Sequence, residues 1–323
     1  MIPARRRLLV PALLLAAWPA AGCTLAEVTT TQGEDVLVVE SVLRTDRDLQ
    51  QILLHRTLQG QVVGGAPGAQ VAVQRENGAR VVFQEAPIEA CTSIGRRFRS
   101  GEDSLDIRAT CYVSPQTGGR WVVAGGRYTL DVATREGERV RGSTQVPASF
   151  DLRGLTGAAR LRNGDRRCIL PPDTPLPLVW STSAGTWAYL TEMEVRGLRG
   201  ALAGSGIDLE DIPEPLQLTG VSVSASDTTL LVPAEVGVFE RFSYNQDLLR
   251  AIQDGFPEGA QVTLVVAATD RNFVNAVRGG AFNPSGNVRI SSVVGDGVGV
   301  FGSLVARTVQ LDVHAGGGSN PCL

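Results

Sequence analysis

The chain has 323 residues, of which 43% are hydrophobic and 20% are charged, and its formal net charge is −3. Its basic residues are all arginines, which excludes a lysine Schiff base and a P-loop lysine, and with them pyridoxal enzymes, P-loop NTPases and kinases. A mildly acidic chain without a basic stripe also argues against a nucleic-acid partner. The length is sufficient for two domains, each with its own core.

Residues 1–22 have the features of a lipoprotein signal peptide, because three arginines precede an apolar run that ends in small residues. The stretch Ala20-Ala21-Gly22-Cys23 resembles a bacterial lipobox, although a lipobox usually has leucine where Ala20 stands. We expect cleavage before Cys23 and lipidation of this residue, followed by a polar tether over residues 23–33. Acyl chains would hold the protein on a membrane leaflet. Ordinary signal cleavage, which leaves Cys23 as a thiol or in a disulfide, is the alternative.

Short strands predict a β-sandwich over residues 34–152. Residues 36–43 read VLVVESVL, a run typical of a buried strand. Residues 69–84 alternate apolar and polar side chains on both sides of Asn77-Gly78, a dipeptide that favours a tight hairpin turn. The same hairpin pattern recurs over residues 125–147. Because no convincing helix interrupts these strands, we expect an all-β sandwich.

The composition changes after the sandwich. Residues 153–177 carry four prolines together with glycine and asparagine, and we interpret them as a linker. The sequence pattern of residues 178–315 predicts a second β-rich domain with one or two short helices. These helices are expected within residues 243–255 and 270–280, where one or two glycines end a run with helical spacing of apolar residues. Residues 316–323 form a tail. The predicted fold is therefore mostly β.

The cysteines favour an exported protein. If Cys23 carries lipid, the remaining cysteines are Cys91, Cys111, Cys168 and Cys322, an even number with three possible pairings. We favour a local Cys91–Cys111 disulfide and a Cys168–Cys322 disulfide that joins the second half to the end of the chain. The cysteine spacing does not fit a zinc site, and we expect no metal.

One glycine-rich stretch, GDGVGVFG, contains the spacing G-x-G-x-x-G. A dinucleotide fingerprint requires a helix directly after the glycines. Residues 303–313 instead read SLVARTVQLDV, in which Val309, Leu311 and Val313 alternate with polar residues, and this pattern predicts a strand. We therefore expect no nucleotide and no other cofactor, and interpret the stretch as a structural turn in which glycines allow close strand approach. Its residues are Gly295, Gly297, Gly299, Phe301 and Gly302.

Catalytic patterns are weak. The two histidines, His55 and His314, are far apart, and no G-x-S-x-G motif supports a Ser-His-Asp triad. Adjacent carboxylates such as Glu210-Asp211 are more typical of a solvated face than of a glycosidase pair. Asp270 lies where a strand gives way to a helix and is predicted to be an N-cap. We therefore expect a non-enzymatic protein.

Several motifs carry a family resemblance. The order GAQVAVQRENG, GGRYTLDVATREG and STQVP, with the later DRNFVNAVRGGAFNPSGNVRISSVVGDGVGVFGS, resembles domain-of-unknown-function family four-two-four-nine, known from Bacteroidetes-type lipoproteins. The resemblance covers most of residues 34–303. It departs where Val293-Val294 replaces the usual Asn-Ile, and the cysteine pairs do not look like a family feature. The resemblance implies an outer-membrane lipoprotein with an Ig-like or transthyretin-like sandwich, often encoded near TonB-dependent receptors. It supplies no catalytic residues.

We expect an exported, membrane-anchored lipoprotein of the cell envelope that acts as an accessory or ligand-binding component of an outer-membrane TonB-dependent transporter. The alternatives are a cell-envelope hydrolase that acts on peptide or glycan, and a structural or adhesion lipoprotein. A hydrolase requires paired carboxylates that converge about 5–10 Å apart in a cleft, which is a property of the tertiary structure.

Overall fold

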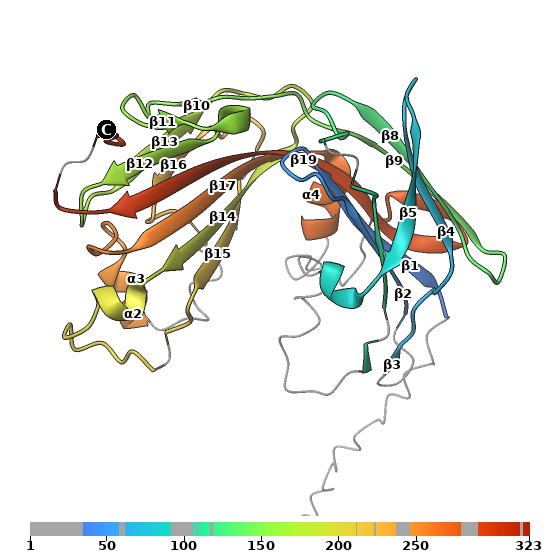
Figure 1. Ribbon diagram of the computed structural model, residues 1–323, viewed down its shortest axis with the longest axis horizontal. Coiled ribbons are helices and arrows are strands. Elements are labelled where there is room, and N and C mark those ends of the chain that lie inside the picture. Colours follow the sequence, from blue (N-terminus) through green and yellow to red (C-terminus); the bar gives the residue numbers. More distant parts are fainter. Residues whose placement is uncertain are drawn as a thin grey trace, which may run out of the picture.

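The computed structural model describes residues 35–57, 62–91, 106–107, 109–116, 119–210, 212–222, 224–236, 246–278, 290–316 and 319–323. The predicted signal peptide and the whole predicted tether, including Cys23, lie outside the described residues. The fold is mostly β, as predicted, and consists of two lobes (Figure 1).

The N-terminal lobe contains the first nine strands and a short 3-10 helix. They are β1 (Leu37–Arg44), β2 (Gln51–Arg56), β3 (Val62–Val63), β4 (Gln70–Arg75), β5 (Arg80–Ala86), η1 (Ile88–Cys91), β6 (Asp106–Ile107), β7 (Thr110–Val113), β8 (Arg127–Ala133) and β9 (Arg139–Gln145).

In the described part of the C-terminal lobe the chain forms strands β10 to β17, and it then returns to the N-terminal lobe through β18 and the first half of β19. The elements are β10 (Leu152–Arg153), β11 (Ala159–Arg160), η3 (Arg162–Gly164), β12 (Arg166–Leu170), β13 (Leu176–Trp180), β14 (Ala188–Arg196), α2 (Leu198–Ala201), β15 (Leu216–Val221), β16 (Thr229–Val232), α3 (Gln246–Ala251), β17 (Gln261–Thr269), α4 (Arg271–Arg278), β18 (Val293–Gly295) and β19 (Gly297–Val313).

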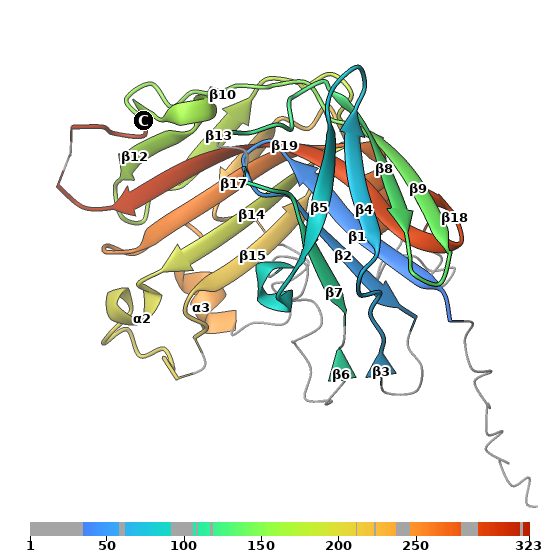
Figure 2. The same ribbon diagram turned by 45° about the vertical axis from the view of Figure 1, so that its right-hand side comes forward.

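A single long strand, β19, connects the two lobes (Figures 1 and 2). Its first half pairs in parallel with β1, from Gly297 opposite Leu37 to Leu304 opposite Arg44. Its second half lies between β17, which is antiparallel, and β12, which is parallel. The sheet order is β15-β14-β17-β19-β1-β2-β7-β5-β4-β8-β9-β18. One sheet therefore continues from one lobe into the other.

The sheet of the N-terminal lobe folds back on itself. Strand β5 pairs with β4 through its first part and with β7 through its last part, so the sheet turns a corner there. At the other end β18 pairs with β9 and, after Asp296, continues into β19 beside β1. Alternate residues such as Val71, Leu130 and Phe301 point into the enclosed core and are at most 1% exposed. Both predicted hairpins are present, as β4–β5 and β8–β9.

The C-terminal lobe packs the sheet around β17 against a small second sheet in the order β10-β13-β16. The predicted helices correspond to α3 and α4; α3 ends at Ala251, before the predicted end, and the residues just before α3 and just after α4 lie outside the described part of the chain. The largest cluster of buried apolar side chains includes residues of both lobes. The lobes therefore share one core.

Two features of the predicted organisation differ from the structure. Residues 153–177, expected as a linker, contain β11 and β12, and β12 pairs with β19 from Arg166 opposite Val309 to Leu170 opposite Val313. Glycine and asparagine before this short strand and prolines after it hid it, because these residues are turn signals in isolation. In addition, β18 and the first half of β19, expected in the second domain, complete the sheet of the N-terminal lobe.

Candidate functional site

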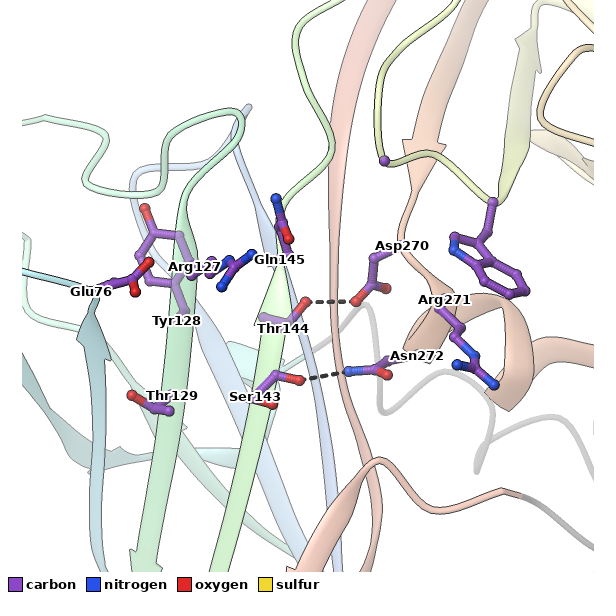
Figure 3. A pocket seen from close by; sticks show the side chains of 12 residues that line it. Glu76, Arg127, Tyr128, Thr129, Ser143, Thr144, Gln145, Asp270, Arg271 and Asn272 are labelled. Atoms are coloured by element: carbon purple, nitrogen blue, oxygen red, sulfur yellow. Dashed lines mark hydrogen bonds between the residues drawn. The ribbon is translucent and has the colours of Figure 1, made fainter.

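A cleft opens where the two lobes meet (Figure 3). Strands β8 and β9 form its N-terminal wall, and the start of α4 with the turn before β14 forms the other wall. The cavity has a volume of about 610 Å³, which is in the range of ligand sites. Its lining residues are Glu76, Arg127, Tyr128, Thr129, Ser143, Thr144, Gln145, Gly185, Trp187, Asp270, Arg271 and Asn272.

The floor of the cleft is a buried hydrogen-bond network around Asp270. The Thr144 hydroxyl donates to Asp270 Oδ2 at 2.6 Å, and the Ser303 amide donates to Oδ1 at 3.1 Å. The hydroxyl groups of Thr144 and Ser303 are 2.7 Å apart. Burial raises the pKa of Asp270, although these hydrogen bonds to the carboxylate act in the opposite direction. The network links β9, β19 and the end of β17, and therefore joins the lobes.

The segment Asp270-Arg271-Asn272 is positioned by a change from strand to helix. Strand β17 ends at Thr269, and the Phe273 amide donates to Asp270 Oδ1 at 2.9 Å, which confirms the predicted N-cap of α4. The Asn272 side chain donates to the backbone oxygens of Ser143 at 2.7 Å and Phe301 at 2.9 Å. The first turn of α4 is thus bound to β9, through the bond to Ser143 drawn in Figure 3, and to β19, through the bond to Phe301.

The accessible groups of the cleft lie above this network. Trp187 is 48% exposed, and the Arg271 guanidinium lies 5.0 Å from the centre of its ring, in a cation–π arrangement. Arg127 and Glu76 are also exposed and come from the opposite wall. The cleft therefore combines an aromatic face with groups of both charges. Such a surface can bind a ligand that has a flat face and polar or anionic substituents.

The four paired cysteines form the two disulfides that we favoured. Cys91 and Cys111 are joined, with Cα atoms 5.8 Å apart, and link η1 to β7. Cys168 and Cys322 are joined, with Cα atoms 4.9 Å apart, and link β12 to the end of the chain. The chain end is also held by a hydrogen bond from the Cys322 amide to the Ile169 oxygen, so residues 319–323 dock on the lobe.

The glycine-rich stretch lies in the N-terminal lobe, and its last residue, Gly302, lies beside Asp270 at the floor of the cleft. Gly297, Gly299 and Gly302 all lie within β19, which continues to Val313. A strand therefore follows the glycines, as the alternation in the sequence predicted. A side chain at Gly299, where φ is +136°, would overlap the Val39 backbone of β1. The Phe301 ring is fully buried. These glycines therefore permit close approach of β19 to β1.

The two histidines that a catalytic triad could use do not line the cleft. His55 lies on β2 with Nε2 3.8 Å from Glu40 Oε1, whereas His314 follows β19 and is exposed. Among the residues that the structure describes, no group of histidine, cysteine or acidic side chains could hold a metal ion. In the same part of the chain, no helix is long and apolar enough to cross a membrane.

Sequence reasoning missed the cleft because its walls come from distant segments. It singled out Asp270 as a helix cap, but nothing local places Thr144 beside it. The even spacing of Trp187, Tyr189 and Met193 predicts that they share one face of a strand, yet Trp187 is exposed while the other two are buried. The reason is that β14 begins at Ala188, so the alternation does not extend to Trp187.

The fold and the cleft define a two-lobed β protein with an open cleft between the lobes. Residues 25–167 match the family model described as "Domain of unknown function (DUF4249)", which confirms the resemblance over this part of the chain. No curated protein matches the chain. A solved structure of a DUF4785 family protein from Legionella pneumophila is similar at 9% sequence identity, with a TM-score of 0.19. That alignment covers 71% of this chain and 51% of the Legionella chain.

Proposed function

We propose that the chain is an exported, lipid-anchored protein of the cell envelope, and that it is a non-enzymatic accessory or ligand-binding component of an outer-membrane TonB-dependent transporter. The cleft between the lobes is its ligand site. The observation that carries the binding role is the open cavity of about 610 Å³ with the exposed Trp187 and Arg271 on its wall. The transporter partnership is supported by the family resemblance.

Export is supported by the cysteines and by the N-terminal residues together. Two disulfides are typical of proteins that fold in an oxidising compartment outside the cytoplasm. The fifth cysteine, Cys23, follows an apolar run and small residues, the setting in which bacterial lipoproteins are acylated. Delivery to the outer membrane is consistent with Thr24 after the lipidated cysteine.

Binding is a better use of this cleft than hydrolysis. A glycosidase-type mechanism requires two carboxyl groups that face the substrate. The carboxylates among the lining residues are Glu76 and Asp270. Asp270 is 5% exposed and accepts hydrogen bonds at both oxygens from Thr144, Ser303 and Phe273, so it holds the lobes together. The exposed aromatic and charged groups remain available for a ligand.

Lipid anchoring is tested by Cys23→Ser. Metabolic labelling with palmitate and membrane fractionation should show an acylated, membrane-bound parent, and an unlabelled Cys23→Ser protein in the soluble fraction. Ala20→Leu, which restores the usual lipobox leucine, is the matched control and should be labelled at least as well as the parent. Unchanged fractionation of Cys23→Ser would remove the lipoprotein proposal.

The transporter partnership is tested by crosslinking in cells and purification from detergent-solubilised membranes. We expect a TonB-dependent outer-membrane protein to be recovered with the parent and to be lost with Cys23→Ser, because the soluble protein is released from the membrane. Recovery of the bait alone from crosslinked membranes counts against an accessory role.

The cleft is tested by native mass spectrometry of the protein purified from its own envelope. We expect a small-molecule adduct on the parent that is lost in the double variant Trp187→Ala, Arg271→Ala. Leu161→Ala removes an apolar side chain of comparable exposure outside the cleft lining and should keep the adduct. Absence of an adduct from the parent, or its persistence in the double variant, contradicts the assignment.

A further inference from the structure

Three aliphatic side chains are exposed together at one corner of the N-terminal lobe. Ile290 is 61% exposed, Val294 is 70% exposed and Val298 is 43% exposed. Nine large apolar residues are exposed in the described part of the chain, and three of them lie in this nine-residue stretch. Isolated exposed aliphatic residues are ordinary, whereas a group on one corner indicates an interaction surface. We call Ile290, Val294 and Val298 the apolar corner.

The backbone holds the apolar corner in a defined geometry. Strand β18 pairs with β9, with Val294 opposite Arg141. The Ser292 amide donates to the Gly299 oxygen at 2.9 Å, and the Gly299 amide donates to the Ser291 hydroxyl at 3.2 Å. These bonds place the segment after Ile290 directly against the segment after Val298. The exposed side chains are therefore presented by paired backbone.

The apolar corner adjoins the point at which the described chain begins. Leu37 pairs with Gly297 and Val38 pairs with Val298, so the start of β1 lies beside the turn between β18 and β19 (Figure 2). Twelve residues, from Cys23 to Glu34, precede the first described residue. Fully extended, twelve residues span at most about 40 Å. A lipid on Cys23 would therefore keep this corner near the bilayer.

The charges around the apolar corner are mixed. Arg139 and Arg141 are exposed on β9, and carboxylates lie beside them: Asp296 accepts a hydrogen bond from the Arg139 backbone amide, and Asp131 forms an ion pair with Arg141 at 3.1 Å. These charged residues do not form a polybasic patch of the kind that selects anionic lipids. The attraction of the apolar corner for a bilayer comes from aliphatic burial, which does not depend on lipid charge.

We propose that the apolar corner is the membrane-contacting surface of the lipid-anchored protein, with its aliphatic side chains inserted at the interface of the bilayer that holds Cys23. This inference rests on the proposed lipid anchor and adds a defined orientation. The N-terminal lobe faces the membrane through β18 and the start of β19.

The experiment uses the mature, acylated chain in phosphatidylcholine vesicles whose acyl chains carry bromine, which quenches tryptophan on contact. Val294→Trp places a reporter at the corner. Val82→Trp is the matched control, because Val82 is 59% exposed on the same lobe but lies on β5, separated from β18 by β4, β8 and β9. Ile290→Trp provides a second reporter if Val294→Trp fails to fold. Emission is taken relative to the parent.

We expect the added emission of Val294→Trp to shift to the blue and to be quenched by brominated lipid, while that of Val82→Trp is unchanged. Phosphatidylglycerol in the vesicles should not alter the quenching. Equal or absent quenching at the two positions in an acylated protein would overturn the membrane contact of the apolar corner and would leave the lipid anchor in place. A blue shift that needs no vesicles and disappears on dilution would assign the corner to a second copy of the chain and overturn the proposal. An intact mass without acyl chains would overturn the lipid anchor, and the orientation with it.

Discussion

Replacing Asp270 by alanine removes an acceptor on which three donors converge. The Phe273 amide loses its helix cap, which costs about 1 kcal/mol. The Ser303 amide is left unpaired in a buried position, which costs about 1–3 kcal/mol. The Thr144 hydroxyl keeps the Ser303 hydroxyl as a partner at 2.7 Å, so its loss adds little. We expect Asp270→Ala to lower the free energy of unfolding by about 2–4 kcal/mol.

Asp270→Asn keeps the hydrogen bonds of this side chain and removes its negative charge, so it separates the two contributions to stability. The asparagine oxygen can accept from the Phe273 and Ser303 amides, while its NH₂ group donates to the Thr144 oxygen. The Thr144 hydroxyl then donates to the Ser303 hydroxyl, an arrangement that their contact allows. We therefore expect Asp270→Asn to lie within about 1 kcal/mol of the parent at neutral pH, because it also removes the cost of burying a charge.

The pH dependence has a defined sign. Burial raises the pKa of Asp270 in the folded protein above its value in the unfolded chain. The stability that this group contributes is therefore fully present below the unfolded-state pKa and is lost as the pH rises through the folded-state pKa. The parent should gain stability relative to Asp270→Asn as the pH falls from about 7 toward about 4.

Urea unfolding with both disulfides intact, followed by tryptophan fluorescence and far-UV circular dichroism, measures these differences. Asp208→Ala is the control, because Asp208 is exposed and accepts from the Glu210 amide at 3.0 Å. It should change the free energy of unfolding by less than about 1 kcal/mol. Equal losses for Asp270→Ala and Asp208→Ala would refute the role of Asp270 at the junction of the lobes.

Further outcomes follow from other contacts. Replacing Cys168 and Cys322 by alanine should lower the urea midpoint more than removal of the other disulfide, because the sequence separations are 154 and 20 residues; the reverse order would contradict the loop-entropy argument. Gly299→Val should abolish cooperative thermal unfolding of the N-terminal lobe, and a parent-like melt would refute close approach of β19 to β1. Hydrogen bonds from Arg56 hold the pKa of Glu138 below its ordinary value, so its contribution to stability is present at neutral pH and is lost as the pH falls through the folded-state pKa. Glu138→Gln should therefore cost about 1 kcal/mol at neutral pH and little in acid, the opposite trend to the buried aspartate, and a pH-independent loss would contradict it.

The features that could be predicted from sequence depend on neighbours a few residues apart. Asn77 has φ of +56° and turns the β4–β5 hairpin, as its pairing with Gly78 indicated. Alternation after Gly302 predicted a strand where a nucleotide site would need a helix, and the strand is present. Asp270 caps α4 because a carboxylate at that position reaches an amide three residues on. Such signals are local, and they appear in the sequence at fixed spacing.

The sequence by itself determined a mostly β chain, its hairpins, the short helices and two disulfides as the favoured pairing. Only the tertiary structure decided that β19 pairs with β1 more than 250 positions away, that residues 166–170 form a strand, and that Thr144 meets Asp270. Spacing along the chain records which face of a strand is buried, but it does not record which strand lies beside it. The cleft and the apolar corner both arise from such pairings, so neither could be read before the strands were placed.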